Sequence, residues 1–451
     1  MADNDTVQAT RILARFVAET RYDDLPPGLI AECRIAVLDA LAAAFVGSTL
    51  PWARRVIEMV HELGGAAQVS VVNQSWRTDV SRAALANGAM IGAFECEPLT
   101  GSHASGTVLP AALAISQRDH RSGKDFLLAL ALGFELSGRL NRSAVGLEST
   151  RGFHNPGVQG PFGAAAAVGK LFGFDAETLA SALGLAGSCA AGLLEFAWAG
   201  DDTKRIHLGR ASALGLESAL LAQTGLHGPV TVIEGRYGYF NAFSEPTDIA
   251  KLTDSLGSKW IIQPASHKAY ATHVTHQAVV QAIQDMKRSH GIDANGITHV
   301  RIRGAHRILE DRHCVRDPKT VMGGQYSLPF TAAVALTRDM SDPLVYDQAA
   351  IEDPLVRRLA ANMELVVDPA VHDLFPAEVS VAFGGKTFTK TTSAHKGSPH
   401  NPLTWDDACE KFGRYTRTIV GERQAQAIMQ AVAALEDQDD MGRIAALTAR
   451  T

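Results

Sequence analysis

The stretch SHKAYATHVTH, residues 266–276, places three histidines, one lysine and one tyrosine within eleven positions. Histidine moves protons near neutral pH and lysine binds carboxylates, so the stretch could form an acid–base site for an anion. It could also bind a metal ion, or form a polar loop without a chemical role. No Asp or Glu lies within it, Lys268 adds a positive charge, and the spacing of His273 and His276 differs from the zinc motif HExxH. We therefore expect no metal ion, and we interpret His276 as a structural residue at a helix start.

Three further segments place histidines and cationic side chains beside Gly or Pro in otherwise apolar surroundings: LTGSHASGTVLP, RGFHNPGVQGP and GDDTKRIHLGR. Backbone N–H groups at such turn-to-helix junctions attract anions. Together with residues 266–276, these segments predict a pocket for a small polycarboxylate, in which a histidine acts at the carbon next to a carboxylate. The alternative is that each histidine is a hydrogen-bonded structural residue and that the charged run is a solvated loop. The side chains in question are His103, His154, Lys204, Arg205, His207 and Arg210.

The N-terminal half of the chain must position these groups on helices. Residues 26–48, 77–95, 122–140 and 175–197 are apolar, contain many Ala and Gly residues, and are separated by Gly, Ser or Pro. Asp175 is expected to cap the last of them. Because several of these segments are apolar on nearly every face, we expect them inside a large bundle or at a subunit contact.

After residue 257 the pattern changes to short, β-branched segments that predict strands. Helices are expected to begin near Thr272, Ser327 and Asp347, and Gly384-Gly385 predicts a hairpin. The sequence thus predicts a mainly α fold, with a large all-helical domain built from both chain ends, 1–264 and 396–451, and a smaller α+β lid domain, 265–395. The expected strands are 258–263, 297–304, 363–368, 377–385 and 386–393.

Composition limits the classes of function. The 451 residues carry a formal net charge of −6, without the basic excess that nucleic-acid binding needs. No apolar run is long enough to span a membrane. The five cysteines are scattered and odd in number, which indicates reduced thiols and a cytoplasmic protein.

Taken in order, these segments, with SLPFTAAVAL (327–336) and KGSPHNPL (396–403), resemble the MmgE/PrpD family over nearly the whole chain. That family contains 2-methylcitrate dehydratase, cis-aconitate decarboxylase and iminodisuccinate epimerase. The resemblance implies a helical domain with a smaller α+β lid, a homodimer, a small di- or tricarboxylate substrate, and catalysis without metal or organic cofactor.

The resemblance also implies roles for particular residues. The sequence His-Ala-Ser-Gly from His103 is similar to the decarboxylase-type His-Pro-Ser-Gly, and Phe-His-Asn around His154 is similar to Phe-His-Pro. His103 would then be the principal acid or base, with His154 orienting the substrate or sharing the proton. The Thr-Lys pair ending at Lys204 implies a carboxylate binder, assisted by Arg205 or Arg210.

The stretch from Lys268 to His273 is similar to the family segment Lys-x-aromatic-Pro-x-His/Cys. Lys268 would bind a carboxylate, His273 would help proton transfer, and Tyr270 would be the aromatic residue beside the substrate. The chain departs from the family at the expected proline, which is Ala271, and at a tyrosine position occupied by Phe330.

A further departure lies before the first histidine, where the family has Asp-Phe-Asp-Asp-Thr and residues 93–97 read Ala-Phe-Glu-Cys-Glu. Glu97 is either a new base or a group that rejects a carboxylate accepted by relatives. The His at 273 and HASGTVLP favour a cofactor-independent lyase of the cis-aconitate decarboxylase type. The alternatives are a 2-methylcitrate-type dehydratase, an epimerase or isomerase of a dicarboxylate, and a protein that binds a carboxylate metabolite without turnover.

Overall fold

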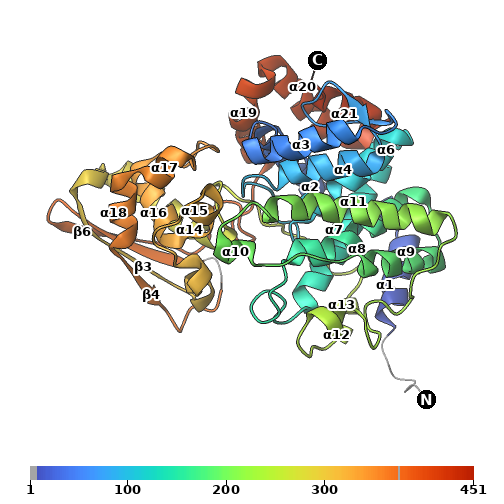
Figure 1. Ribbon diagram of the computed structural model, residues 1–451, viewed down its shortest axis with the longest axis horizontal. Helices are drawn as coiled ribbons and strands as arrows, with labels where there is room; N and C mark the ends of the chain where they lie inside the picture. The colour runs from blue at the N-terminus through green and yellow to red at the C-terminus, as the bar shows by residue number, and fades with distance from the viewer. Residues whose placement is uncertain (1–7, 374–375, 451) are drawn as a thin grey trace.

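The computed structural model describes residues 8–373 and 376–450, which form a large helical body beside a smaller part that contains a sheet (Figure 1). Within the described residues no helix has the length and apolar character needed to cross a membrane. The helices of the N-terminal half are α1 (Ala9–Glu19), α2 (Pro27–Gly47), α3 (Pro51–Leu63), α4 (Val80–Ile91), α5 (Ala104–Thr107), α6 (Leu109–Arg118), α7 (Gly123–Ser143), α8 (Asn155–Phe172), α9 (Ala176–Ser188), α10 (Phe196–Ala199), α11 (Lys204–Gln223), α12 (Tyr239–Phe243) and α13 (Ala250–Thr253).

Local sequence explains where the main helices start. Asp79 accepts hydrogen bonds from the backbone at the start of α4, Ser122 and Asp125 form a capping box on α7, and Asp175 caps α9 as expected. Most residues of α2 are buried, and α8 packs against both α7 and α11. The helix predicted over 175–197 is too long, because α9 ends at Ser188.

The C-terminal helices return to the N-terminal ones. α19 (Trp405–Val420) packs against α2, and α20 (Glu422–Ala433) and α21 (Gly442–Thr448) follow it at the same end of the body (Figure 1). The structure is therefore mainly α, as predicted. The predicted boundaries at 264/265 and 395/396 stay predictions.

The smaller part holds a four-stranded sheet in the order β4-β3-β5-β6, with β3 parallel to β4 and antiparallel to β5. β5 and β6 form the predicted hairpin. α14 packs on β5, β6 and α16. The elements are α14 (Gln277–His290), β3 (Ile297–Gly304), α15 (Val321–Tyr326), α16 (Leu328–Thr337), α17 (Gln348–Glu352), α18 (Pro354–Ala361), β4 (Met363–Val367), β5 (Ala377–Phe383) and β6 (Lys386–Thr392); a separate two-stranded ribbon pairs β1 (Val69–Ser70) with β2 (Arg77–Thr78).

The strand predicted at 258–263 is wrong, since the segment forms turns. Its backbone bonds to α7 instead of to a sheet. The Ile261 N–H donates to Glu135 at 2.8 Å, and the Lys259 carbonyl accepts from Arg139 at 2.9 Å. The β-branched pattern reflects burial against the helical body, because Trp260 and Ile262 are buried there.

Candidate functional site

Close packing of two helices sets the position of the site. Gly88 on α4 and Gly209 on α11 face each other, and a Cβ on Gly209 would lie 2.1 Å from the Leu85 carbonyl oxygen. Only glycine permits this approach. The contact brings the segment that follows α4, which carries Glu95, beside Lys204 at the start of α11.

The loop between α4 and α5 is held in a backbone conformation that side chains disfavour. Glu95, Thr100 and His103 have positive φ values of 56°, 24° and 54°. Each such position costs about 1–3 kcal/mol and persists only where the surroundings enforce it, typically at functional sites. Three of the six described non-glycine residues with positive φ thus lie in this one loop, and two of them are Glu95 and His103.

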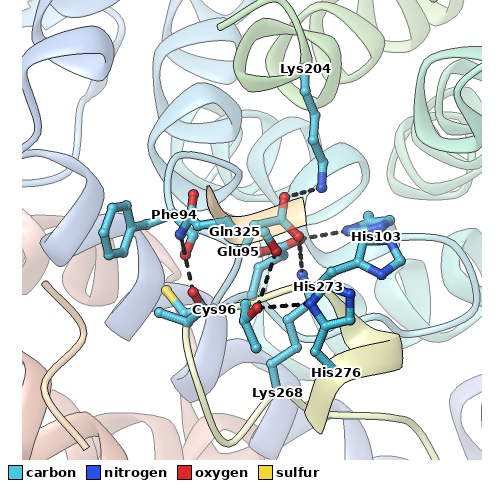
Figure 2. Close-up of polar contacts among 12 residues, drawn as sticks. Phe94, Glu95, Cys96, His103, Lys204, Lys268, His273, His276 and Gln325 are labelled. Atoms are coloured by element: carbon cyan, nitrogen blue, oxygen red, sulfur yellow. Dashed lines mark hydrogen bonds and ion pairs between the residues drawn. The ribbon is translucent and has the colours of Figure 1, made fainter. Parts of the chain in front are cut away.

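Five charged or titratable side chains, Glu95, Glu97, His103, Lys204 and Lys268, form what we call the site cluster. Glu95 lies between the two lysines (Figure 2): it pairs with Lys204, and its Oε2 accepts from Lys268 Nζ at 2.8 Å. Lys268 Nζ also donates to Glu97 Oε1 at 3.0 Å, and the same oxygen lies 2.6 Å from His103 Nδ1. The carboxylates and lysines are 1% exposed, whereas the His103 side chain is 18% exposed. A substrate would therefore reach the cluster at His103.

The charges of the cluster depend on one another. Burial raises the pKa of Glu95 and of Glu97, but the nearby lysines outweigh it and hold both values below the ordinary one. Burial lowers the pKa of Lys268, but the same carboxylates raise it above its usual value. Both carboxylates and Lys268 are therefore charged at neutral pH.

His103 is neutral at rest. Burial lowers its pKa below the ordinary value, although Glu97 works in the opposite direction. A carboxylate only accepts hydrogen bonds, so the neutral ring donates its Nδ1–H to Glu97 and leaves Nε2 with a free lone pair. This arrangement can take a proton from a substrate, or deliver one once the ring is protonated.

His154 lies next to His103, with ring centroids 6.0 Å apart. Its Nδ1 is 2.9 Å from Nδ1 of His207, so one ring donates and the other accepts. Burial and Lys204 lower the pKa of both rings, that of His207 to about 4. His154 is thus a buried neutral histidine that can share a hydrogen bond with a substrate near His103.

His273 lies beside Tyr326, with ring centroids 4.8 Å apart, and the Lys204 ammonium lies 5.0 Å from the same tyrosine ring. His276 and His313 join it, so that ring nitrogens of the three histidines lie within 4.8 Å of one another. Burial is the first cause that lowers the pKa of each, to about 3 for His313. His276 precedes α14 as expected, but its ring does not cap the helix and faces these histidines instead.

Three close histidines raise the question of a metal ion again, and their hydrogen bonds bear on it. His313 donates Nδ1–H to the Tyr326 carbonyl at 3.1 Å, which leaves a lone pair on Nε2. His273 Nδ1 lies 2.8 Å from the Thr275 hydroxyl and 3.4 Å from the Thr275 N–H, so these local groups occupy that nitrogen. Nε2 of His276 and Nε2 of His313 are buried without a hydrogen-bond partner among the described residues, so these rings can share a proton with each other or bind a metal ion. The absence of a metal remains a prediction.

Three predicted substrate-binding residues lie outside the site cluster. The Arg205 guanidinium stacks 3.9 Å from the Trp52 ring centroid, donates to the Ala93 carbonyl and pairs with Asp202. Arg210 is exposed. Tyr270 donates to Gln281 at 3.1 Å and lines a neighbouring cavity of about 640 Å³. Arg205 thus supports the backbone just before Glu95, while its buried Nη2 has no hydrogen-bond partner among the described residues.

Sequence reasoning missed several residues of the region. Glu95 stands in the quoted stretch 93–97, where two acidic residues two positions apart were a usable signal. Gln325, whose amide donates to the Phe94 and Ala271 carbonyls at 3.0 and 3.1 Å, links the loop to the segment that carries Lys268 and His273 (Figure 2). His313 and Tyr326 lie in segments of ordinary composition, and only the fold brings them to His273.

Comparisons with known proteins show the family of the chain. The MmgE/PrpD N-terminal domain model matches residues 11–252, and the C-terminal domain model matches residues 270–437. The chain is 26% identical over 97% of its length to the cis-aconitate decarboxylase-like protein oryM of Aspergillus oryzae, of which 96% is covered. It is 27% identical to human cis-aconitate decarboxylase and 25% identical to that of Aspergillus terreus, over 96% of this chain and 92% and 94% of those proteins. The protein belongs to the MmgE/PrpD family.

Proposed function

We propose that the protein is a lyase acting at the carbon next to a carboxylate of a small di- or tricarboxylate, in a reaction like that of the cis-aconitate decarboxylases. One observation carries the proposal: two buried ammonium groups converge beside an imidazole that a carboxylate holds in place. When the bond between the substrate carbon and the departing CO2 breaks, its electron pair stays on that carbon. The negative charge is then delocalised onto the group of the substrate adjacent to that carbon. Lys204 and Lys268 stabilise that charge, and His103 supplies the proton that ends the reaction.

The other predicted residues take supporting roles in this proposal. Carboxylates of the substrate replace Glu95 and Glu97 as ion-pair partners of the lysines. His154 and His273 orient the substrate or share the proton with His103. No metal or organic cofactor takes part, and the active form is a homodimer.

A second candidate, a dehydratase or an epimerase, is favoured by the free Nε2 lone pair of His103, because both reactions begin with proton abstraction. The two candidates differ in their pH dependence. A decarboxylase that needs protonated His103 loses activity as the pH rises through its pKa, whereas a base-initiated reaction gains it. A protein that only binds a carboxylate metabolite needs the lysines but not the histidines.

The decisive experiment is a proton NMR time course in D2O with cis-aconitate, 2-methylcitrate, iminodisuccinate and malate. Decarboxylation gives a product one carbon shorter with deuterium next to a carboxylate, dehydration gives a new alkene, and epimerisation gives exchange without loss of mass. His103→Ala and Lys268→Ala should lose the signal. A folded protein that neither converts nor exchanges any of these acids would contradict the proposal.

A further inference from the structure

The lysines proposed to bind substrate are already neutralised within the protein. Lys204 pairs with Glu95, and Lys268 is shared between Glu95 at 2.8 Å and Glu97 at 3.0 Å. Two ammonium groups and two carboxylates sum to zero. The neighbouring cation, Arg205, is engaged by Asp202 and a backbone carbonyl. Each carboxylate brought in by a substrate therefore adds a negative charge that these cations do not balance.

The cost of that imbalance grows with each carboxylate, since an unpaired ion in a desolvated site costs several kcal/mol. A tricarboxylate would raise the count to five carboxylates for two lysines. A dicarboxylate leaves four, and an amino group on it would remove one further unit of charge. Charge alone thus favours substrates with fewer carboxylates.

The hydrogen bonds of Glu97 point in the same direction. Its Oε1 is shared by His103 Nδ1 at 2.6 Å and Lys268 Nζ, while its Oε2 is buried and has no hydrogen-bond partner among the described residues. A buried carboxylate oxygen without a partner requires a donor. A hydroxyl or amino group of the substrate satisfies it, whereas a carboxylate placed there would repel it.

We propose that Glu97 is the specificity-determining residue of this site. It selects a substrate with at most two carboxylates and with a hydroxyl or amino group close to the carbon on which His103 acts. Glu97 hydrogen-bonds to His103 Nδ1 at 2.6 Å, so a group that donates to Glu97 Oε2 lies beside the imidazole whose Nε2 acts on that carbon. The inference rests on the proposed function and narrows its substrate class to the dicarboxylates.

Three acids that differ at one position test the proposal: propane-1,2,3-tricarboxylate, 3-hydroxyglutarate and glutarate. Calorimetric titration of the wild-type protein should give the tightest binding for 3-hydroxyglutarate, by about tenfold or more over the other two. In Glu97→Gln, which removes one negative charge, the affinity for the tricarboxylate should gain about tenfold relative to that for glutarate. Glu177→Gln, which removes one charge from a side chain 65% exposed, should bind all three acids like the wild type.

The order of the three affinities is measured on the wild-type protein, so the test remains valid if Glu97→Gln fails to fold. Tricarboxylate binding equal to or tighter than hydroxyglutarate binding, or binding of none of the three, overturns the selection by Glu97. Because these titrations measure binding without turnover, their failure is separate from failure of the NMR experiment. Conversion of cis-aconitate with no preference among the three acids would support the proposed lyase activity and contradict the proposed selectivity of Glu97.

Discussion

His267 and Lys268 are neighbours in the chain, yet they enter two different buried charge clusters. Lys268 belongs to the site cluster. His267 belongs to a second set, the junction cluster, in which Asp39 binds His267 Nδ1 at 2.7 Å and Lys411 Nζ at 2.6 Å, and Glu32 binds His267 Nε2 at 2.9 Å. Both clusters combine one histidine and two carboxylates with lysine, one in the junction cluster and two in the site cluster, so residue types alone do not separate them.

The partners of each histidine make the difference. His267 has a carboxylate on both ring nitrogens, and although burial lowers its pKa, Asp39 and Glu32 raise it to about 9. It is a fixed cation. His103 has a carboxylate on one nitrogen, a lowered pKa and a free lone pair on the other. A buried histidine is poised for chemistry when one nitrogen is held and the other is left open.

The largest expected effect is on catalytic activity, and it should distinguish His103 from His267. His103→Ala removes the proton carrier and should lower kcat by about 10²–10⁴-fold. Its melting temperature should stay near that of the wild type, because Lys268 still neutralises Glu97. Steady-state kinetics and calorimetry check both values, with His120→Ala, an exposed histidine, as the control. Full activity in His103→Ala would remove the distinction between the clusters.

His267→Ala should act mainly on stability. It leaves Glu32 without its histidine partner and Asp39 with Lys411 alone, and loss of one partner from a buried ion pair costs about 3–5 kcal/mol. Urea unfolding measures this loss. The folded fraction should keep a kcat within a few-fold of the wild type. A stable but inactive His267→Ala would place this residue in the site instead.

The junction cluster should also make stability depend on pH. The folded-state pKa of His267, about 9, lies above its unfolded value near 6.5. Its contribution is therefore complete below pH 6.5 and is lost as the pH rises through 9, by about 3 kcal/mol. The free energy of unfolding should fall over this range in the wild type and in His120→Ala. The part due to this residue should be missing in His267→Ala.

The smallest effect concerns His273, His276 and His313. If they share protons, dialysis against a chelator such as 1,10-phenanthroline should change kcat less than twofold, and added zinc should not increase it. Loss of activity that zinc restores would show that the three rings bind a metal. Plasma emission spectrometry of the purified protein measures its metal content independently.

The two clusters also show how far sequence reasoning reaches. Helices, the β5–β6 hairpin and the gathering of His103, Lys204 and Lys268 in one region follow from caps, periodicity and ordered motifs. The role of Glu95 does not, because it depends on the approach of α4 and α11 at Gly88 and Gly209. Likewise, nothing in the neighbours of His267 shows that its partners are Glu32 and Asp39, more than two hundred residues away.

The position of Lys411 in the chain affects when the site can form during protein synthesis. It lies on α19, and its Nζ donates to the Cys96 and Lys268 carbonyls at 2.8 and 2.7 Å, next to both halves of the site. The residues that carry the chemistry are translated long before it. During synthesis on the ribosome, the site therefore stays without this tie until α19, which also packs on α2, has been made. Activity should appear only after the last helices have left the exit tunnel, so a nascent chain is not yet an enzyme.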